Sequence, residues 1–114
     1  MTKAVIFYKN NLFQSIEISG HSGYQESGFD IVCSAVSTAV FTTLNLIDRI
    51  YGDTAYQIKE NQEQGYLKFS IEENLPIIMV NNSLLIEEII QNLICMLDSI
   101  ANDYPKNFNL KIRK

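Results

Sequence analysis

The sequence predicts an α+β fold, a two-layer sandwich in which two long helices cover one face of a five-stranded, largely antiparallel sheet. Three observations lead to this prediction. Five short runs are rich in strand-forming residues, two longer stretches repeat their apolar residues with a helical period, and the order along the chain is ββαββαβ. Helices with one apolar face each pack on one side of a sheet, which leaves its other face polar.

Four of the five strands are expected in two hairpins. Residues 3–8 and 12–19 predict the first hairpin, with a short polar turn between them. Residues 55–59 and 66–71 predict the second. After the second hairpin, residues 77–80 could form a further short strand.

The first helix is expected from residue 31 to about residue 51, where the apolar period becomes helical. Asp30 is the expected N-cap, because its carboxylate can accept hydrogen bonds from the free N–H groups of the first turn. Gly52 is expected to end the helix. The residues expected on its buried face are Val32, Val36, Val40, Leu44, Ile47 and Tyr51.

The second helix is expected to begin at a cap formed by Asn82 or Ser83 and to run to about Asn102. Pro105 prevents its continuation, and residues 107–113 then predict the last strand. The residues expected to face the core are Ile86, Ile89, Ile90, Leu93, Leu97 and Ile100 in the helix and Phe108, Leu110 and Ile112 in the strand.

Length and composition predict one folded domain over residues 1–114. Of the 114 residues, 46% are hydrophobic and 19% are charged, and the formal net charge is −4. This balance is typical of a globular protein, and the negative charge disfavours direct binding of nucleic acid through its phosphates. The basic residues near the C-terminus are interpreted as solvated positions; they are Lys106, Lys111, Arg113 and Lys114.

The chain is expected to be a cytoplasmic protein that does not cross a membrane. Its longest apolar stretches, residues 31–50 and 84–100, are interrupted by polar side chains, and no secretory signal is evident. Its two cysteines, Cys33 and Cys95, lie within helical patterns and not in a disulfide framework, which indicates a reducing compartment. Cys95 is expected to pack in the core.

Cys33 is the first candidate for chemistry, because the predicted helix places it in the first turn. Unpaired N–H groups and the helix dipole favour an anion there, and cysteines at helix starts can have a depressed pKa. Ser37 and Phe41 share its flank of the helix, beside the core stripe. The alternative interpretation is a packed thiol, since free cysteine is often buried.

His21 is the second candidate. It is the only histidine, and it lies where the second strand gives way to a glycine-rich loop. If that strand ends near the first helix, His21 can act as a general base for Cys33; otherwise it is a solvated loop residue. Two cysteines and one histidine cannot complete a zinc site without carboxylates, so no metal or other cofactor is expected.

The segment around these two residues resembles the ribosomal-processing cysteine proteases of the Prp family. The resemblance rests on Gly20-His21-Ser22-Gly23 and on Gly28-Phe29-Asp30-Ile31-Val32-Cys33-Ser34-Ala35-Val36-Ser37. These residues match a Gly-His pair, a glycine-rich loop and an Asp-x-Val-Cys-[Ala/Ser]-Ala-x-Ser sequence that opens a helix. Ser22 departs mildly from the pattern, because many members have alanine there.

The resemblance implies a specific activity. His21 and Cys33 would form the catalytic dyad of an endopeptidase that removes the N-terminal extension of a large-subunit ribosomal protein, number twenty-seven, during ribosome maturation. The enzyme would be a homodimer, and the loop with Gly20, Ser22, Gly23 and Gly28 would cover the active site. Asp30 and Ser37 are the candidates for supporting roles.

Two other functions compete with this one. A non-catalytic ribosome-associated binding or assembly module would use Cys33 and His21 only for packing. A redox-sensing thiol protein would need a resolving cysteine, which only Cys95 could supply. Selective alkylation of Cys33 would favour the enzyme, because a catalytic thiol reacts as its thiolate.

Overall fold

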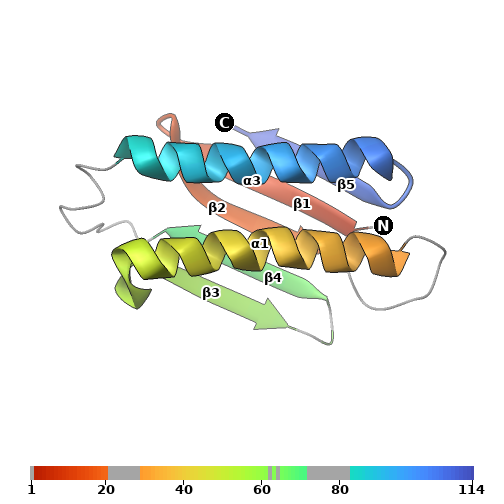
Figure 1. Cartoon of the computed structure of the whole chain (residues 1–114), viewed down its shortest axis with the longest axis horizontal. Coiled ribbons are helices and arrows are strands. Elements are labelled where there is room, and N and C mark those ends of the chain that lie inside the picture. The colour runs from red at the N-terminus through yellow and green to blue at the C-terminus, as the bar shows by residue number, and fades with distance from the viewer. Residues whose placement is uncertain (1, 21–28, 62, 64, 72–82) are drawn as a thin grey trace.

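A computed structural model describes residues 2–20, 29–61, 63, 65–71 and 83–114 (Figure 1). The described elements follow the predicted order, with one short 3-10 helix, η1, added after the first long helix. The strands are β1 (Thr2–Lys9), β2 (Leu12–Ser19), β3 (Tyr56–Asn61), β4 (Tyr66–Ile71) and β5 (Phe108–Arg113). The helices are α1 (Phe29–Tyr51), η1 (Asp53–Ala55) and α3 (Ser83–Asp103).

The strands form one sheet with the order β3-β4-β2-β1-β5. Three neighbouring pairs are antiparallel, and the pair β1–β5 is parallel. The parallel pair arises because the chain returns to the far edge of the sheet after α3. The predicted α+β fold with a largely antiparallel five-stranded sheet is therefore confirmed, and the sheet is mixed.

Both long helices lie on the same face of the sheet, α1 over the β3–β4 side and α3 over the β1–β5 side (Figure 1). The predicted stripe of α1 is buried from Val32 to Ile47, both of which are fully inaccessible, and Tyr51 is partly buried. By length and composition alone, residues 31–51 would suit a membrane span. The buried stripe accounts for part of this hydropathy, while Ile31, Phe41, Leu46 and Ile50 are exposed. The inner face of the sheet contributes Ala4, Ile6, Ile16, Ile18, Leu67, Phe69, Ile71 and Phe108 to the same core.

The turn of the first hairpin is explained by its two asparagines. Asn10 and Asn11 have φ angles of 54° and 62°, the left-handed backbone that a two-residue turn of the primed type requires. Asparagine tolerates this conformation better than most residues. A bulge between Phe7 and Tyr8 shifts the register beside the turn.

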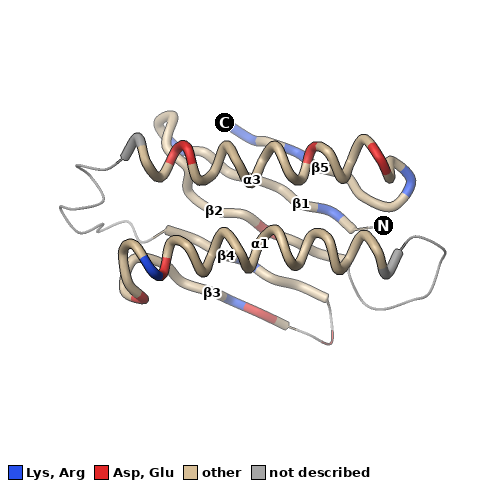
Figure 2. The backbone as a smooth tube through the Cα atoms, in the orientation of Figure 1, with Lys and Arg blue, Asp and Glu red and all other residues tan. Residues whose placement is uncertain are grey.

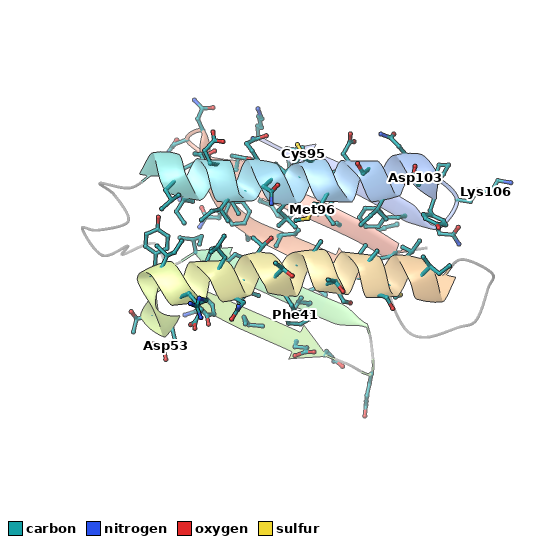
Figure 3. All side chains as sticks on the ribbon, in the orientation of Figure 1. Phe41, Asp53, Cys95, Met96, Asp103 and Lys106 are labelled. Carbon is teal, nitrogen blue, oxygen red and sulfur yellow. The ribbon has the colours of Figure 1, made fainter. Side chains whose placement is uncertain are left out.

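Three predictions are corrected. The first helix begins at Phe29 and not at residue 31, so Asp30 is its second residue and not its N-cap. Cys95 is exposed and not packed, because two residues from Leu93 turn a helix by about 200°, away from the buried stripe (Figure 3). Ile112 is 43% exposed, since coverage by α3 decreases along the edge strand β5.

The remaining elements agree with prediction to within two or three residues, apart from one segment. The second hairpin starts at Tyr56, because Ala55 belongs to η1, and it extends to Asn61. The predicted short strand at residues 77–80 lies outside the described residues.

Candidate active site

Cys33 is the fifth residue of α1 and is half-buried on the flank of the helix. The unpaired N–H groups of an α-helix belong to its first four residues, so Cys33 lies just beyond them. The effect of the helix dipole is therefore smaller at Cys33 than the predicted helix start implied. Its partial exposure agrees with a reactive thiol and argues against a core cysteine.

A hydroxyl group approaches the sulfur of Cys33 from the first strand. Thr2 Oγ1 lies 3.9 Å from Cys33 Sγ, within hydrogen-bonding range for sulfur. Thr2 is fully buried, and its N–H donates a 2.9 Å hydrogen bond to the carbonyl of Asn107. Thr2 is not among the site residues predicted from the sequence. The sequence did contain a signal for its burial, because Thr2 alternates with Ala4 and Ile6 on the face of β1 that points into the core.

A pocket opens beside Cys33 between α1 and the strands β3 and β4. The pocket is shallow: its cavity volume is about 30 Å³, and the space including its open mouth is about 340 Å³. Ser37 and Phe41 follow Cys33 along the same side of α1, so the predicted grouping of these three residues is confirmed. The complete set of described lining residues is Ile18, Cys33, Val36, Ser37, Val40, Phe41, Glu60 and Leu67.

The walls of the pocket are mostly apolar. Phe41 is 47% exposed, and Figure 3 shows it on the side of α1 that faces β3 and β4. Glu60 is the one charged side chain among the described lining residues. Figure 2 shows that α1 has no charged residue from Ile31 to the residue before Asp48. The site thus combines a thiol, two hydroxyl groups, an apolar floor and one carboxylate.

Strand β3 lies along the same flank of α1, in the opposite direction. At one end Glu60 meets Cys33 and Phe41 at the pocket. At the other end the Tyr56 hydroxyl donates a 2.7 Å hydrogen bond to Asp48 Oδ1. This hydrogen bond is the main reason that the pKa of Tyr56 is raised above its ordinary value, with burial and the nearby carboxylates adding to it.

The described residues next to positions 21–28 lie at the end of the sheet near Cys33. Ser19, the last residue of β2, pairs with Lys3, the neighbour of Thr2. Gly20 follows, and its N–H donates a 3.0 Å hydrogen bond to the carbonyl of Gly65. Its φ of 87° favours glycine. The segment ends where α1 begins.

Several predicted site residues lie outside the described part of the structure. They are His21, Ser22, Gly23 and Gly28, together with the side chain of Asp30. Within the described residues, no group of histidine, cysteine and carboxylate side chains is arranged to hold a metal ion. The arrangement that is described suits thiol chemistry on an extended ligand that reaches the pocket.

Comparison with known proteins identifies a matching family. The family model described as cysteine protease Prp matches residues 1–109. The ribosomal processing cysteine protease Prp of Bacillus subtilis (strain 168) is 31% identical over 97 residues, which cover 84% of this chain and 82% of the relative.

Two solved structures have the same fold. SMU.848 of Streptococcus mutans superposes with a TM-score of 0.83 at 23% identity, covering 99% of this chain and 94% of that one. The essential ribosomal processing protease Prp of S. aureus, in complex with a substrate peptide, gives a TM-score of 0.83 at 20% identity, covering 99% of this chain and all of that one.

Proposed function

Since the chain belongs to the cysteine protease Prp family, we propose that Cys33 is its nucleophile and His21 the general base. The observation that supports Cys33 most directly is its position. It is half-buried at the wall of a pocket, whereas Cys95 lies exposed on the outer side of α3. His21 is proposed because it is the only histidine and directly follows Gly20, at the same end of the sheet as Cys33.

The reaction would proceed through an acyl-enzyme. His21 accepts the thiol proton of Cys33, and the sulfur attacks the scissile carbonyl carbon. N–H groups in the first turn of α1 stabilise the resulting oxyanion. The C–N bond breaks as His21 returns the proton to the leaving amine, which leaves a thioester. Water then attacks the thioester, releasing the new carboxyl group and the thiol.

Asp30 and Ser37 have supporting roles in this proposal. Asp30 places an acidic residue in the first turn of α1, where a negative charge is favourable for the helix. Ser37 follows Cys33 by one turn and lines the same pocket, so its hydroxyl can bind the peptide or the dyad. The loop that contains Gly20, Ser22, Gly23 and Gly28 would control access to the thiol.

The proposed substrate is the extended precursor of ribosomal protein number twenty-seven of the large subunit. The B. subtilis relative is a ribosomal processing protease, and the S. aureus protease binds a substrate peptide. The net charge of −4 favours a protein substrate over direct contact with RNA. We further propose that the enzyme is a single-domain protein of the cytoplasm and that it is a homodimer. Light scattering of the purified protein tests the homodimer, because it gives the molar mass in solution.

The decisive experiment is incubation of the enzyme with the extended ribosomal protein, followed by mass spectrometry of the new N-terminus. Cleavage should disappear in Cys33→Ala and in His21→Ala and persist in Cys95→Ala, the matched control. Circular dichroism should show that all three variants are folded. Retained cleavage in Cys33→Ala would refute the assignment, and binding of the precursor without cleavage by the unmodified enzyme would instead support a non-catalytic module.

A further inference from the structure

Strand β3 is one of the two edges of the sheet. Its inner edge pairs with β4 from Tyr56 to Asn61, and no other strand of the described structure pairs with its outer edge. All of its side chains except Tyr56 are exposed. An edge strand of six residues is about 20 Å long, enough to pair with several residues of an extended peptide.

The edge runs directly from the pocket that contains Cys33. Glu60 lines that pocket, while Tyr56, four residues earlier, is tied to Asp48 near the far end of α1. A peptide that follows β3 would therefore start beside the thiol and lead away from it along the flank of α1. The opposite edge, β5, lies across the sheet from this pocket (Figure 1).

An apolar strip accompanies this path. Ile58 faces the helix side of the sheet, because it pairs with the buried Phe69, and it is 42% exposed. Phe41 on α1 is 47% exposed. It lies between Cys33 and Asp48 along the helix, as Ile58 lies between Glu60 and Tyr56 along β3. In an extended peptide every second side chain points to the same face, so alternate side chains of a bound peptide would pack on this strip.

We propose that the outer edge of β3 binds the substrate backbone as an added strand, on one side of the scissile bond. Main-chain hydrogen bonds to the edge would supply affinity, and the strip formed by Phe41 and Ile58 would select apolar side chains at alternate positions. A protease benefits from this mode, because an extended substrate presents its scissile bond to the nucleophile. The inference rests on the proposed function, since it assigns Cys33 to catalysis.

A set of N-methylated peptides tests the backbone contacts. The parent peptide spans the cleavage site of the ribosomal precursor, and each member has one amide N–H replaced by N–CH₃. Strand pairing uses every second N–H, so methylation should raise KM at least tenfold at alternate positions on one side of the scissile bond and less than threefold between them. Equal effects at successive positions would overturn the proposal.

Amide hydrogen exchange locates the pairing on the protein. With the parent peptide bound to Cys33→Ala, alternate N–H groups of β3 should exchange at least tenfold more slowly, while those of the other edge, β5, keep their rates. Protection of β5 alone, or protection of β3 that depends on protein concentration without peptide, would overturn the proposal. If the precursor is cleaved but neither the alternating effect of N-methylation nor the alternating protection of β3 is found, binding at the β3 edge is refuted and the protease assignment remains. Absence of cleavage refutes the proposed function.

Discussion

Thr2 Oγ1 lies 3.9 Å from Cys33 Sγ and joins the first residue of β1 to the candidate nucleophile. A hydroxyl that donates to a thiolate stabilises the charged form of the sulfur, and hydrogen bonds to charged groups contribute about 1.5–3 kcal/mol. If Cys33 is the nucleophile, as proposed, Thr2 would be a positioning residue that acts through it.

We predict that Thr2→Val lowers the rate of alkylation of Cys33 at neutral pH by about tenfold, the equivalent of about 1.4 kcal/mol. The pH at which alkylation is half-maximal should move upward, because the thiolate loses a donor. Thr43→Val is the matched control, since Thr43 is also buried and its hydroxyl bonds to the carbonyl of Ala39. An unchanged pH profile in Thr2→Val would show that the hydroxyl only fills space.

Alkylation of Cys33 must be measured without interference from the second thiol, Cys95. Because it is exposed, it will react with alkylating reagents, although the sequence had suggested a packed thiol. In a Cys95→Ser background we expect one fast, pH-dependent modification at Cys33, measured by mass spectrometry of the intact protein. Modification at the rate of a free cysteine in an unfolded peptide would contradict activation of Cys33 by its surroundings.

Truncating Phe41 should weaken substrate binding with little effect on the fold. Phe41 is 47% exposed beside the pocket, so Phe41→Ala removes apolar surface that a peptide would cover, worth about 1–2 kcal/mol. KM for the precursor peptide should rise about tenfold with kcat nearly unchanged. Leu85→Ala is the control, because Leu85 is 43% exposed on α3; an equal rise in both variants would exclude a specific contact.

The sequence was sufficient for the fold because apolar periodicity determines which faces are buried. The stripe from Val32 to Ile47 and the alternation of Leu67, Phe69 and Ile71 were both predicted and are both buried. Cys95 was wrongly predicted to be buried because the prediction relied on its apolar neighbours in sequence, Ile94 and Met96. Its angular position on the helix places it away from the core. Ile112 was wrongly predicted because alternation does not reveal how far a helix covers an edge strand.

For the candidate site, the sequence located Cys33 and its flank but not the groups brought to it from other strands. Ser37 and Phe41 follow from helical spacing alone. Thr2 and Glu60 lie at the site because of the order of the strands, which places β1 in the interior of the sheet and β3 at its edge. No local pattern specifies that order, so neither residue could be assigned to the site in advance.

The hydrogen bond that anchors β3 to α1 should contribute to stability in a pH-dependent way. Tyr56 donates to Asp48 at 2.7 Å, and this bond, together with burial and the charges of Asp48 and Asp53, raises the pKa of Tyr56 above its ordinary value of 10.0. The folded state therefore holds this proton more tightly than the unfolded state. The stabilisation is fully present below the unfolded pKa and is lost as pH rises through the folded pKa.

Tyr56→Phe should accordingly lower the free energy of unfolding by about 1 kcal/mol near neutral pH. The difference from the unmodified protein should persist up to about pH 9 and shrink above about pH 10, as measured by urea unfolding at several pH values. Tyr104→Phe is the control, since no hydrogen bond of the Tyr104 side chain is observed among the described residues. An unchanged free energy of unfolding in Tyr56→Phe would mean that packing of the ring, which phenylalanine keeps, and not the bond to Asp48, holds the edge strand beside the pocket.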